Sequence, residues 1–298
     1  MPVPSGRQVL LRYGSHRATV VEVGGGLRTY DVAGVPVLDG YTDAQICPAG
    51  RGQVLIPWPN RVPDGRYSFE GDDYQLPINE VERNTSIHGL VRWARWDIDN
   101  PASHLASATH ELPPQPGWPF ELACRVDYEL SEAGLTVTTS ARNLADVPCP
   151  FGVGHHPYVT ADTGTLDSQT LRIPARTVLA MDGQGRVTGR SEVVETEFAP
   201  LRETALDTPF TDLVRDGDGL CRVRLTGSNG TVEVWMDEAW PYLQVFTGDT
   251  LGAQERRRGL AVEPMTCPPA ALASGEGVIV LQPGESFTGR WGIFPPGG

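Results

Sequence analysis

The chain has 298 residues, of which 37 are acidic and 24 basic, so its formal net charge at pH 7 is −13. A chain this acidic repels phosphate backbones, which argues against nucleic acid and anionic membranes as partners, although a local arginine cluster could override the overall field. All of the basic residues are arginines, and the lack of lysine excludes Schiff-base lysines, pyridoxal phosphate anchors and P-loop lysines.

The cysteines are odd in number and far apart, and no pair has the spacing of a zinc knuckle or a thioredoxin-type redox site. They are Cys47, Cys124, Cys149, Cys221 and Cys267. Buried free thiols in a reducing cytosol are the interpretation that this pattern favours. The N-terminus has no apolar signal core, and no window is as long as a membrane span. We therefore expect a soluble, cytoplasmic protein.

Alternating apolar residues, separated by turn residues, recur along the whole chain and predict strands. In chain order, the expected elements are a strand at 18–23, hairpins at 66–70 with 74–76, 121–130 with 135–144 and 221–225 with 231–235, and a strand at 286–294. Helical periodicity over three turns is missing, and no linker divides the chain. The sequence thus predicts an all-β protein, a large antiparallel β-sandwich with one domain over residues 1–298. A propeller is the alternative, but no blade motif repeats.

Two segments in the first third of the chain differ from ordinary sandwich loops. The rigid stretch from Ile56 to Arg61 presents Asn60 and Arg61 beside Trp58. A guanidinium suits sugar hydroxyls and an indole suits the apolar face of a pyranose, but a surface arginine beside a core tryptophan is the simpler interpretation. His88 directly precedes a glycine, where the backbone can approach a ligand closely. A structural hydrogen bond is the alternative role for His88.

Two later segments carry an acid/base pair. If Gly154–Pro157 is extended, His155 and His156 point to opposite faces, so only one of them enters a given pocket and the two cannot bind one metal. Glu263 follows a short apolar run and is fixed by nearby prolines, as a general base requires, although a turn carboxylate that caps backbone amides is equally compatible. Together the segments offer an acid, a base and hydrogen-bond donors. They contain no nucleophile elbow and no metal cluster, so we expect neither a metal nor another cofactor.

The order of these motifs resembles the aldose 1-epimerase (galactose mutarotase) family, especially its bacterial branch. The matching motifs are Asn60-Arg61, His88-Gly89, His156-Pro157-Tyr158 and Glu263-Pro264, with Asp207-Thr-Pro-Phe210 and Tyr242-Leu-Gln-Val-Phe-Thr-Gly248 between the last two. The resemblance extends from roughly residue 20 to residue 294. It implies a β-supersandwich fold, the galactose mutarotase-like fold.

The resemblance also implies a role for each matching residue. Glu263 would be the general base, His156 the general acid and His88 a second histidine at the ring-oxygen side of the sugar. Arg61, Asp207 and Gln244 would bind sugar hydroxyls, and Asn60 would support Arg61. Val159 and Ala270 replace the phenylalanine and asparagine that are common in the family, and the stretch around Asp207 lacks the histidine and asparagine of galactose-preferring members. The sugar preference is therefore not predicted.

The sequence thus predicts a cofactor-independent isomerase, a monomer or homodimer, that interconverts the α and β anomers of a free aldohexose. One alternative is a hexose-6-phosphate 1-epimerase, for which Arg83, Arg92 and Arg95 near His88 could bind the phosphate. Another alternative is a non-catalytic sugar-binding protein on the same scaffold, against which the presence of both His156 and Glu263 argues. The run Arg256–Arg258 is expected in a solvated loop, and Trp118 either flanks the sugar or fills the core.

Overall fold

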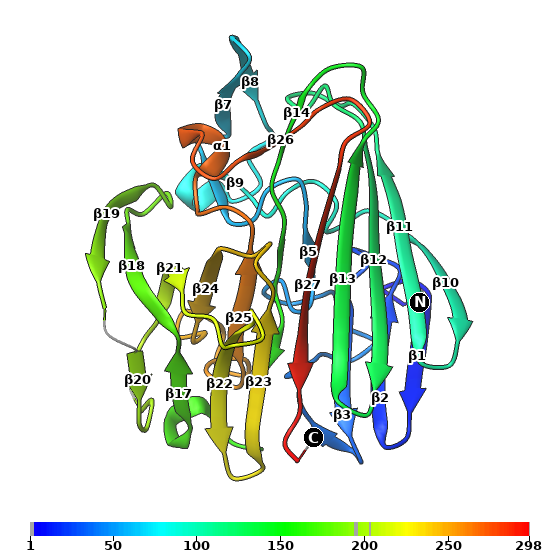
Figure 1. Ribbon diagram of the computed structural model, residues 1–298, viewed down its shortest axis with the longest axis vertical. Coiled ribbons are helices and arrows are strands. Elements are labelled where there is room, and N and C mark those ends of the chain that lie inside the picture. The colour runs from blue at the N-terminus through cyan, green and yellow to red at the C-terminus, as the bar shows by residue number, and fades with distance from the viewer. Residues whose placement is uncertain (1–2, 194–195, 203, 298) are drawn as a thin grey trace.

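A computed structural model describes residues 3–193, 196–202 and 204–297, and every strand pairing within these ranges is antiparallel. The largest sheet has nine strands. Their order is β10 (Asp97–Ala102), β11 (Leu105–Leu112), β12 (Leu122–Ser131), β13 (Gly134–Asn143), β27 (Ser286–Phe294), β23 (Gly230–Met236), β22 (Cys221–Gly227), β17 (Thr170–Ile173) and β20 (Thr196–Phe198). The C-terminal strand β27 therefore lies in the middle of this sheet, between β13 and β23 (Figure 1).

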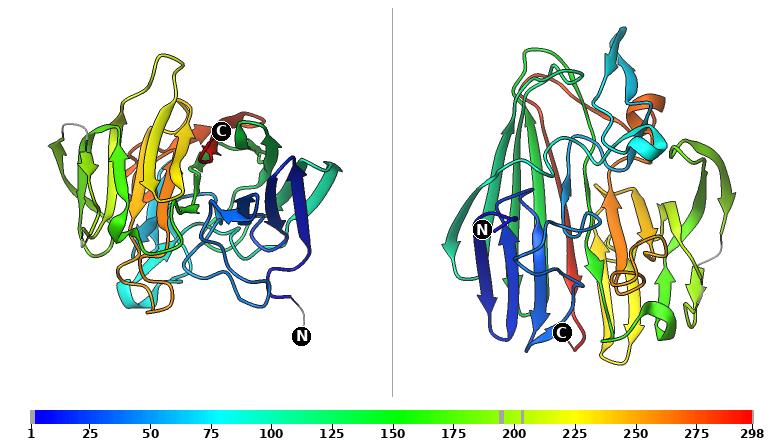
Figure 2. Two further views of the ribbon diagram at one scale, coloured as in Figure 1. Left: turned by 90° about the horizontal axis from the view of Figure 1, so that it is seen from below. Right: turned by 180° about the vertical axis from the view of Figure 1, so that it is seen from behind.

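A second sheet has eight strands. Its order is β19 (Val187–Glu192), β18 (Ala175–Met181), β21 (Asp207–Leu213), β24 (Tyr242–Phe246), β25 (Leu260–Met265), β15 (Gly154–His155) and β5 (Val54–Leu55), with β16 (Tyr158–Val159) also paired to β25. All six residues of β25 are buried. Figures 1 and 2 show β24 and β25 on one side of a sandwich and β22 and β23 on the other.

The remaining elements cover the other half of the nine-stranded sheet and the end of the molecule. A four-stranded sheet, whose strands β1 and β2 pack against β11 and β12, consists of β1 (Gln8–Tyr13), β2 (His16–Val21), β3 (Leu27–Val32) and β4 (Val35–Pro36). The two-stranded ribbons are β6 (Arg61–Pro63) with β9 (Thr85–Ile87), β7 (Arg66–Phe69) with β8 (Asp72–Gln75), and β14 (Cys149–Phe151) with β26 (Ile279–Leu281). The short helical segments are η1 (Val81–Arg83), η2 (Leu166–Ser168) and α1 (Ala271–Ser274).

The residue pattern explains the long hairpin of β12 and β13. Leu122, Cys124, Val126, Tyr128 and Leu130 alternate with more exposed residues and form one continuous core with apolar residues of the facing sheets. This alternation is what the pleat of a half-buried strand requires. The tight turn between the strands depends on a glycine, because at Gly134 (φ 129°) a Cβ would lie 2.2 Å from a backbone oxygen of β27.

The structure confirms the all-β prediction and each expected hairpin. The first expected strand, 18–23, is β2 at His16–Val21, and the chain turns away before the glycines. The extension of one domain over residues 1–298 stays a prediction. None of the described helices is long and apolar enough to cross a membrane.

Neighbouring residues on opposite faces of β12 provide a stability test. Leu130 is fully buried and Glu129 is exposed. Leu130→Ala should lower the free energy of unfolding by about 2–5 kcal/mol, because it removes buried methyl groups and leaves a cavity. Glu129→Ala should change it by no more than about 0.5 kcal/mol. Urea unfolding of both variants measures the difference, and equal losses would contradict the assignment of faces.

Candidate active site

A cavity of about 490 Å³ is lined by residues of β21, β24 and β25 of the eight-stranded sheet and by residues of the ribbon of β6 and β9. Its wall contains every residue to which the sequence analysis assigned a role: Asn60, Arg61, His88, His156, Asp207, Gln244 and Glu263. Two larger hollows, of about 600 and 740 Å³, open elsewhere on the surface and contain none of these residues. The residues of interest, spread over two hundred positions of sequence, therefore meet in one place.

Strand register brings the acid/base candidates together. Gly154 is opposite Met265, and Tyr158 is opposite Ala261, so His156, between them, lies beside Glu263 of β25. On the other side of β25, Gln244 of β24 is paired with Glu263. Cross-strand neighbours share a face of the sheet, so these side chains line the cavity side by side. His156 Nε2 lies 3.4 Å from Glu263 Oε1, and both side chains are more than nine-tenths buried.

His155 points the opposite way, as the sequence predicted for an extended segment. Its Nε2 lies 2.7 Å from Thr139 Oγ1, and its ring contacts Trp240 and Trp291 in the core between the sheets. Burial lowers the pKa of His155 to about 3, so it is a neutral core residue. Among the residues that the structure describes, no group of three or more histidine, cysteine or acidic side chains is arranged to hold a metal ion.

Burial pushes the two members of the pair toward their neutral forms. It raises the pKa of Glu263 well above its usual value; the negative charge of Asp207 adds to this shift, and Arg61 opposes it. Burial also lowers the pKa of His156 to about 3, and the positive charges of Arg51 and Arg92 act in the same direction. Burial therefore favours the neutral forms of both groups, with a shared proton on Glu263 rather than on His156.

The segment from Pro57 to Arg61 folds against His88 through two reciprocal contacts. Asn60 N donates to His88 Nδ1 at 3.2 Å, and His88 N donates to Asn60 O at 2.8 Å. Because Nδ1 accepts a hydrogen bond, neutral His88 carries its hydrogen on Nε2. Burial lowers the pKa of His88 well below its usual value, so the ring stays neutral. Gly89 is required here, since a Cβ at this position would lie 2.0 Å from Ile56 O.

Arg61 is held by a carboxylate that the sequence analysis did not identify. Its Nε and Nη2 donate to the two oxygens of Glu80 at 2.7 and 2.9 Å, and Thr85 Oγ1 donates to the same carboxylate at 2.5 Å. The backbone N of Arg61 also donates to Asn60 Oδ1 at 2.9 Å. Among the described residues none accepts a hydrogen bond from Arg61 Nη1, so this edge of the guanidinium is available to a ligand.

The opposite wall carries a second polar pair. Gln244 Nε2 donates to Asp207 Oδ1 at 2.7 Å. Gln244 Oε1 and Glu263 Oε2 are buried and have no hydrogen-bond partner among the described residues. An unpaired buried acceptor lowers the free energy of unfolding by about 1–3 kcal/mol. A ligand whose hydroxyl groups donate to these two oxygens would make the missing hydrogen bonds.

Several further wall residues were missed by the sequence analysis. The Tyr158 ring stacks on His156 with centroids 5.1 Å apart and an interplanar angle of 8°, and Arg51 Cζ lies 4.4 Å from the Tyr158 centroid. Trp93 and Phe246 supply further aromatic surface. Tyr158 belongs to the quoted His-Pro-Tyr motif, which was the available signal. Nothing local in the sequence marks the other residues.

The structure confirms the core position that the sequence favoured for Trp58, removes Arg95 from the alternative phosphate site, and contradicts the solvated position expected for Arg257. Trp58 does not face the cavity: it is fully buried, and its ring centroid lies 6.1 Å from that of Trp118, which is also a core residue. Arg95 lies outside the cavity, largely exposed and ion-paired to Glu22. Arg257 is not solvated, because its buried guanidinium pairs with two carboxylates, those of Asp167 and Asp249.

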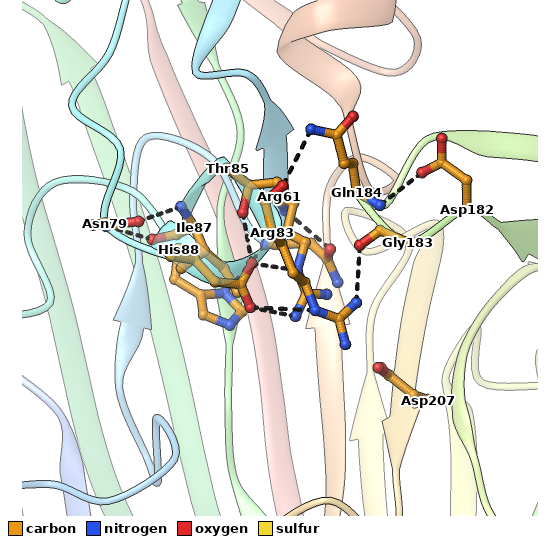
Figure 3. A network of polar contacts seen from close by, with 12 residues as sticks. Arg61, Asn79, Arg83, Thr85, Ile87, His88, Asp182, Gly183, Gln184 and Asp207 are labelled. Atoms are coloured by element: carbon orange, nitrogen blue, oxygen red, sulfur yellow. Dashed lines mark hydrogen bonds and ion pairs between the residues drawn. The ribbon is translucent and has the colours of Figure 1, made fainter.

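Arg83 connects this wall to the loop after β18. Its Nη1 donates to Gly183 O at 3.0 Å, and its Nε lies 3.8 Å from a Glu80 oxygen. Figure 3 shows Arg83 and Arg61 side by side, with Arg83 directed toward Gly183 and Asp207 at a distance from both. Arg83 therefore shares the counterion of Arg61.

Comparison with known proteins gives a consistent result. The sequence model of the aldose 1-epimerase family matches residues 7–293. The protein YihR of Escherichia coli K12 is 36% identical over 289 residues, which cover 94% of this chain and 91% of YihR. Mouse galactose mutarotase is 24% identical over 86% of this chain and 81% of its own length. The crystal structure of a GalM/aldose epimerase homologue from C. elegans superposes with a TM-score of 0.82 at 16% identity, covering 96% of this chain and 98% of that one.

The buried carboxyl group predicts a specific pH dependence of stability. Since the pKa of Glu263 is raised in the folded state, its contribution to stability is complete below the unfolded pKa near 4.5 and is lost as pH rises through the folded pKa. Glu263→Gln should therefore gain stability relative to the wild type above pH 4.5, by about 1.4 kcal/mol for each unit of pKa difference. Urea unfolding at a series of pH values measures this, with exposed Glu129→Gln as the matched control. A stability difference that does not grow with pH would contradict the assignment.

Proposed function

The chain belongs to the aldose 1-epimerase family, and we propose that it interconverts the α and β anomers of a free aldose by opening and reclosing the sugar ring. The observation that carries the proposal is the buried contact between His156 Nε2 and Glu263 Oε1 at 3.4 Å. Such a pair can remove a proton from one oxygen and deliver one to another within a single step.

The reaction needs both proton transfers at atoms bonded to the same carbon. Ring opening breaks the C1–O5 bond and turns C1–O1 into a carbonyl. The carboxylate of Glu263 takes the proton of the anomeric hydroxyl, and the imidazolium of His156 protonates O5. Because O1 and O5 are both attached to C1, two groups 3.4 Å apart can reach both oxygens. Rotation about C1–C2 and reversal of both transfers close the ring on the other face of the aldehyde.

The protonation that burial favours for the pair matches the ring-open stage of this cycle. After opening, Glu263 is protonated and His156 is neutral, which is the distribution that burial favours for the pKa values of both groups. A closed-ring sugar requires the proton to pass from Glu263 to His156 first. Ring opening thus converts the charged pair, which burial disfavours, into the neutral pair.

The other polar residues hold the sugar in this account. Arg61 Nη1 and the Asp207–Gln244 pair bind hydroxyl groups, and Asn60 fixes Arg61 through the contact of its Oδ1 with Arg61 N. Neutral His88 donates from Nε2 at the ring-oxygen side, because its Nδ1 is already occupied. Every step uses side chains of this chain, so the proposed isomerase needs no cofactor.

The two alternatives from the sequence receive less support. A hexose-6-phosphate 1-epimerase would need Arg83, Arg92 and Arg95 to converge, but Arg95 lies outside the cavity and Arg83 shares Glu80 with Arg61. A non-catalytic sugar-binding protein would have no use for a carboxyl group buried against an imidazole, since burial of that group costs stability whenever it ionises.

Removal of the base tests the proposal directly. Glu263→Gln should lower kcat for anomer exchange by about 10²–10⁴-fold, because the amide cannot accept the anomeric proton. Polarimetry of freshly dissolved α-glucose and α-galactose measures the rate. Circular dichroism and calorimetric binding of the sugar serve as controls for fold and binding. A variant that retains near-wild-type catalysis would refute the role of Glu263.

The shared proton predicts the alkaline limb of the pH profile. The pair is active while it holds one proton, so kcat/KM falls as pH rises through the raised pKa of Glu263. After burial, the charge of Asp207 is the next cause of that raised pKa, so Asp207→Asn should move the alkaline limb to lower pH. Glu82→Gln, at another carboxylate of the cavity wall, is the matched control and should leave the limb in place. A limb that stays or moves upward in Asp207→Asn would contradict the shared-proton account.

A further inference from the structure

One arginine of the described cavity wall has no direct ion pair: Glu80 acts on the pKa of Arg92 only through its charge. Arg92 Nε is buried and, among the described residues, no acceptor bonds to any nitrogen of its guanidinium. By contrast, Arg61 has a two-point contact with Glu80, and Arg83 has both Glu80 and a backbone carbonyl. An arginine stays charged in proteins, so a partly buried guanidinium without a partner leaves charge-assisted hydrogen bonds unmade.

Arg92 lies at the histidine end of the cavity. Its Cζ is 5.5 Å from the Trp93 ring centroid, and after burial its positive charge is among the causes that lower the pKa of both His88 and His156. The charge of Arg61 also lowers the pKa of His88, but Asp207 and Glu263 act on the pKa of Arg61 and are not among the causes for Arg92. In the proposed complex His88 faces the ring oxygen O5, so C6, which is attached to the ring carbon C5 beside that oxygen, lies on the side of Arg92.

We propose that Arg92 binds a singly charged oxyanion on C6 of the sugar, so that the preferred substrates are acidic aldoses of the hexuronate type. This inference rests on the proposed function. A carboxylate matches the planar fork of donors that a guanidinium presents, and it replaces the missing counterion.

The charges of the wall favour one negative charge over two. Arg92 is the cation without an ion-pair partner in the described wall. Glu80 is paired with Arg61 and Arg83, which leaves Glu82 and Asp207 as wall carboxylates that no arginine of the described residues contacts. A phosphate dianion would gain one arginine and be repelled by these groups, and the net charge of −13 adds to the repulsion. A single charge is balanced by Arg92 alone.

An anion at Arg92 would also assist the chemistry. The charge of Arg92 opposes protonation of His156, so a counterion on the substrate weakens this opposition. Passage of the proton from Glu263 to His156 then becomes easier when the sugar is acidic. The charge on the substrate and the position of the shared proton are therefore coupled through the guanidinium of Arg92.

The test compares glucuronate, glucose and glucose 6-phosphate by anomer-exchange NMR, which follows the anomeric proton signals of each sugar. In the wild type, kcat/KM should be about 10- to 150-fold higher for glucuronate than for glucose, the range of a charge-assisted hydrogen bond. It should also exceed that for glucose 6-phosphate. In Arg92→Met the glucuronate-to-glucose ratio should fall by the same factor. The matched control is Arg83→Met, in which this ratio should change by less than about threefold, because Arg83 shares Glu80 with Arg61.

Equal wild-type values for glucuronate and glucose, a ratio unchanged in Arg92→Met, or a preference for glucose 6-phosphate over glucuronate would each overturn the inference. Calorimetric binding of glucuronate to Glu263→Gln, with and without Arg92→Met, separates this inference from the proposed function. Arg92-dependent binding in Glu263→Gln, together with a wild-type protein that exchanges the anomers of none of the three sugars, would refute the proposed function and support the anion site. Exchange of the glucose anomers by the wild type, together with glucuronate binding that does not depend on Arg92, would support the proposed function and overturn the anion site.

Discussion

A carboxyl group removed from water and placed 3.4 Å from a neutral imidazole is the constraint around which this cavity is organised. Glu263 lies on β25, all of whose residues are buried, so the sheet on both sides must supply the free energy that an ionisable group costs there. That position also fixes the chemistry. Neighbouring strands place His156 on one side of Glu263 and Gln244 on the other, and the register leaves little freedom for either side chain.

Much of the fold could be predicted from the local sequence pattern, because each predicted hairpin is a contiguous stretch in which apolar and polar residues alternate. What the pattern could not predict is pairing between distant strands. Strand β27 closes the gap between β13 and β23, and no local signal in residues 286–294 specifies those neighbours. The same limit applies to the site: the motifs identified His156 and Glu263, but only the register of β15, β16 and β25 shows that they touch.

The errors share a physical cause, which is that counterions and burial are set by tertiary contacts. The sequence left open whether Trp58 faces a sugar or the core, and packing against Trp118 places it in the core. Arg257 was expected in solvent, but two carboxylates distant in sequence or across a turn neutralise it. Glu80 was missed because its partner, Arg61, is nineteen residues away. The same reasoning gives Arg92 its significance, since only the placed side chains of the described residues show that its guanidinium has no direct partner among them.

The central claim is that Glu263 and His156 act as one unit that passes a single proton, and a double-mutant cycle in kcat/KM tests it most directly. Glu263→Gln, His156→Asn and the double variant would be compared by anomer-exchange NMR with one sugar. If the pair is a unit, the double variant should be no slower than the slower single variant, within about threefold. Losses that multiply in the double variant would show two independent groups and contradict the account.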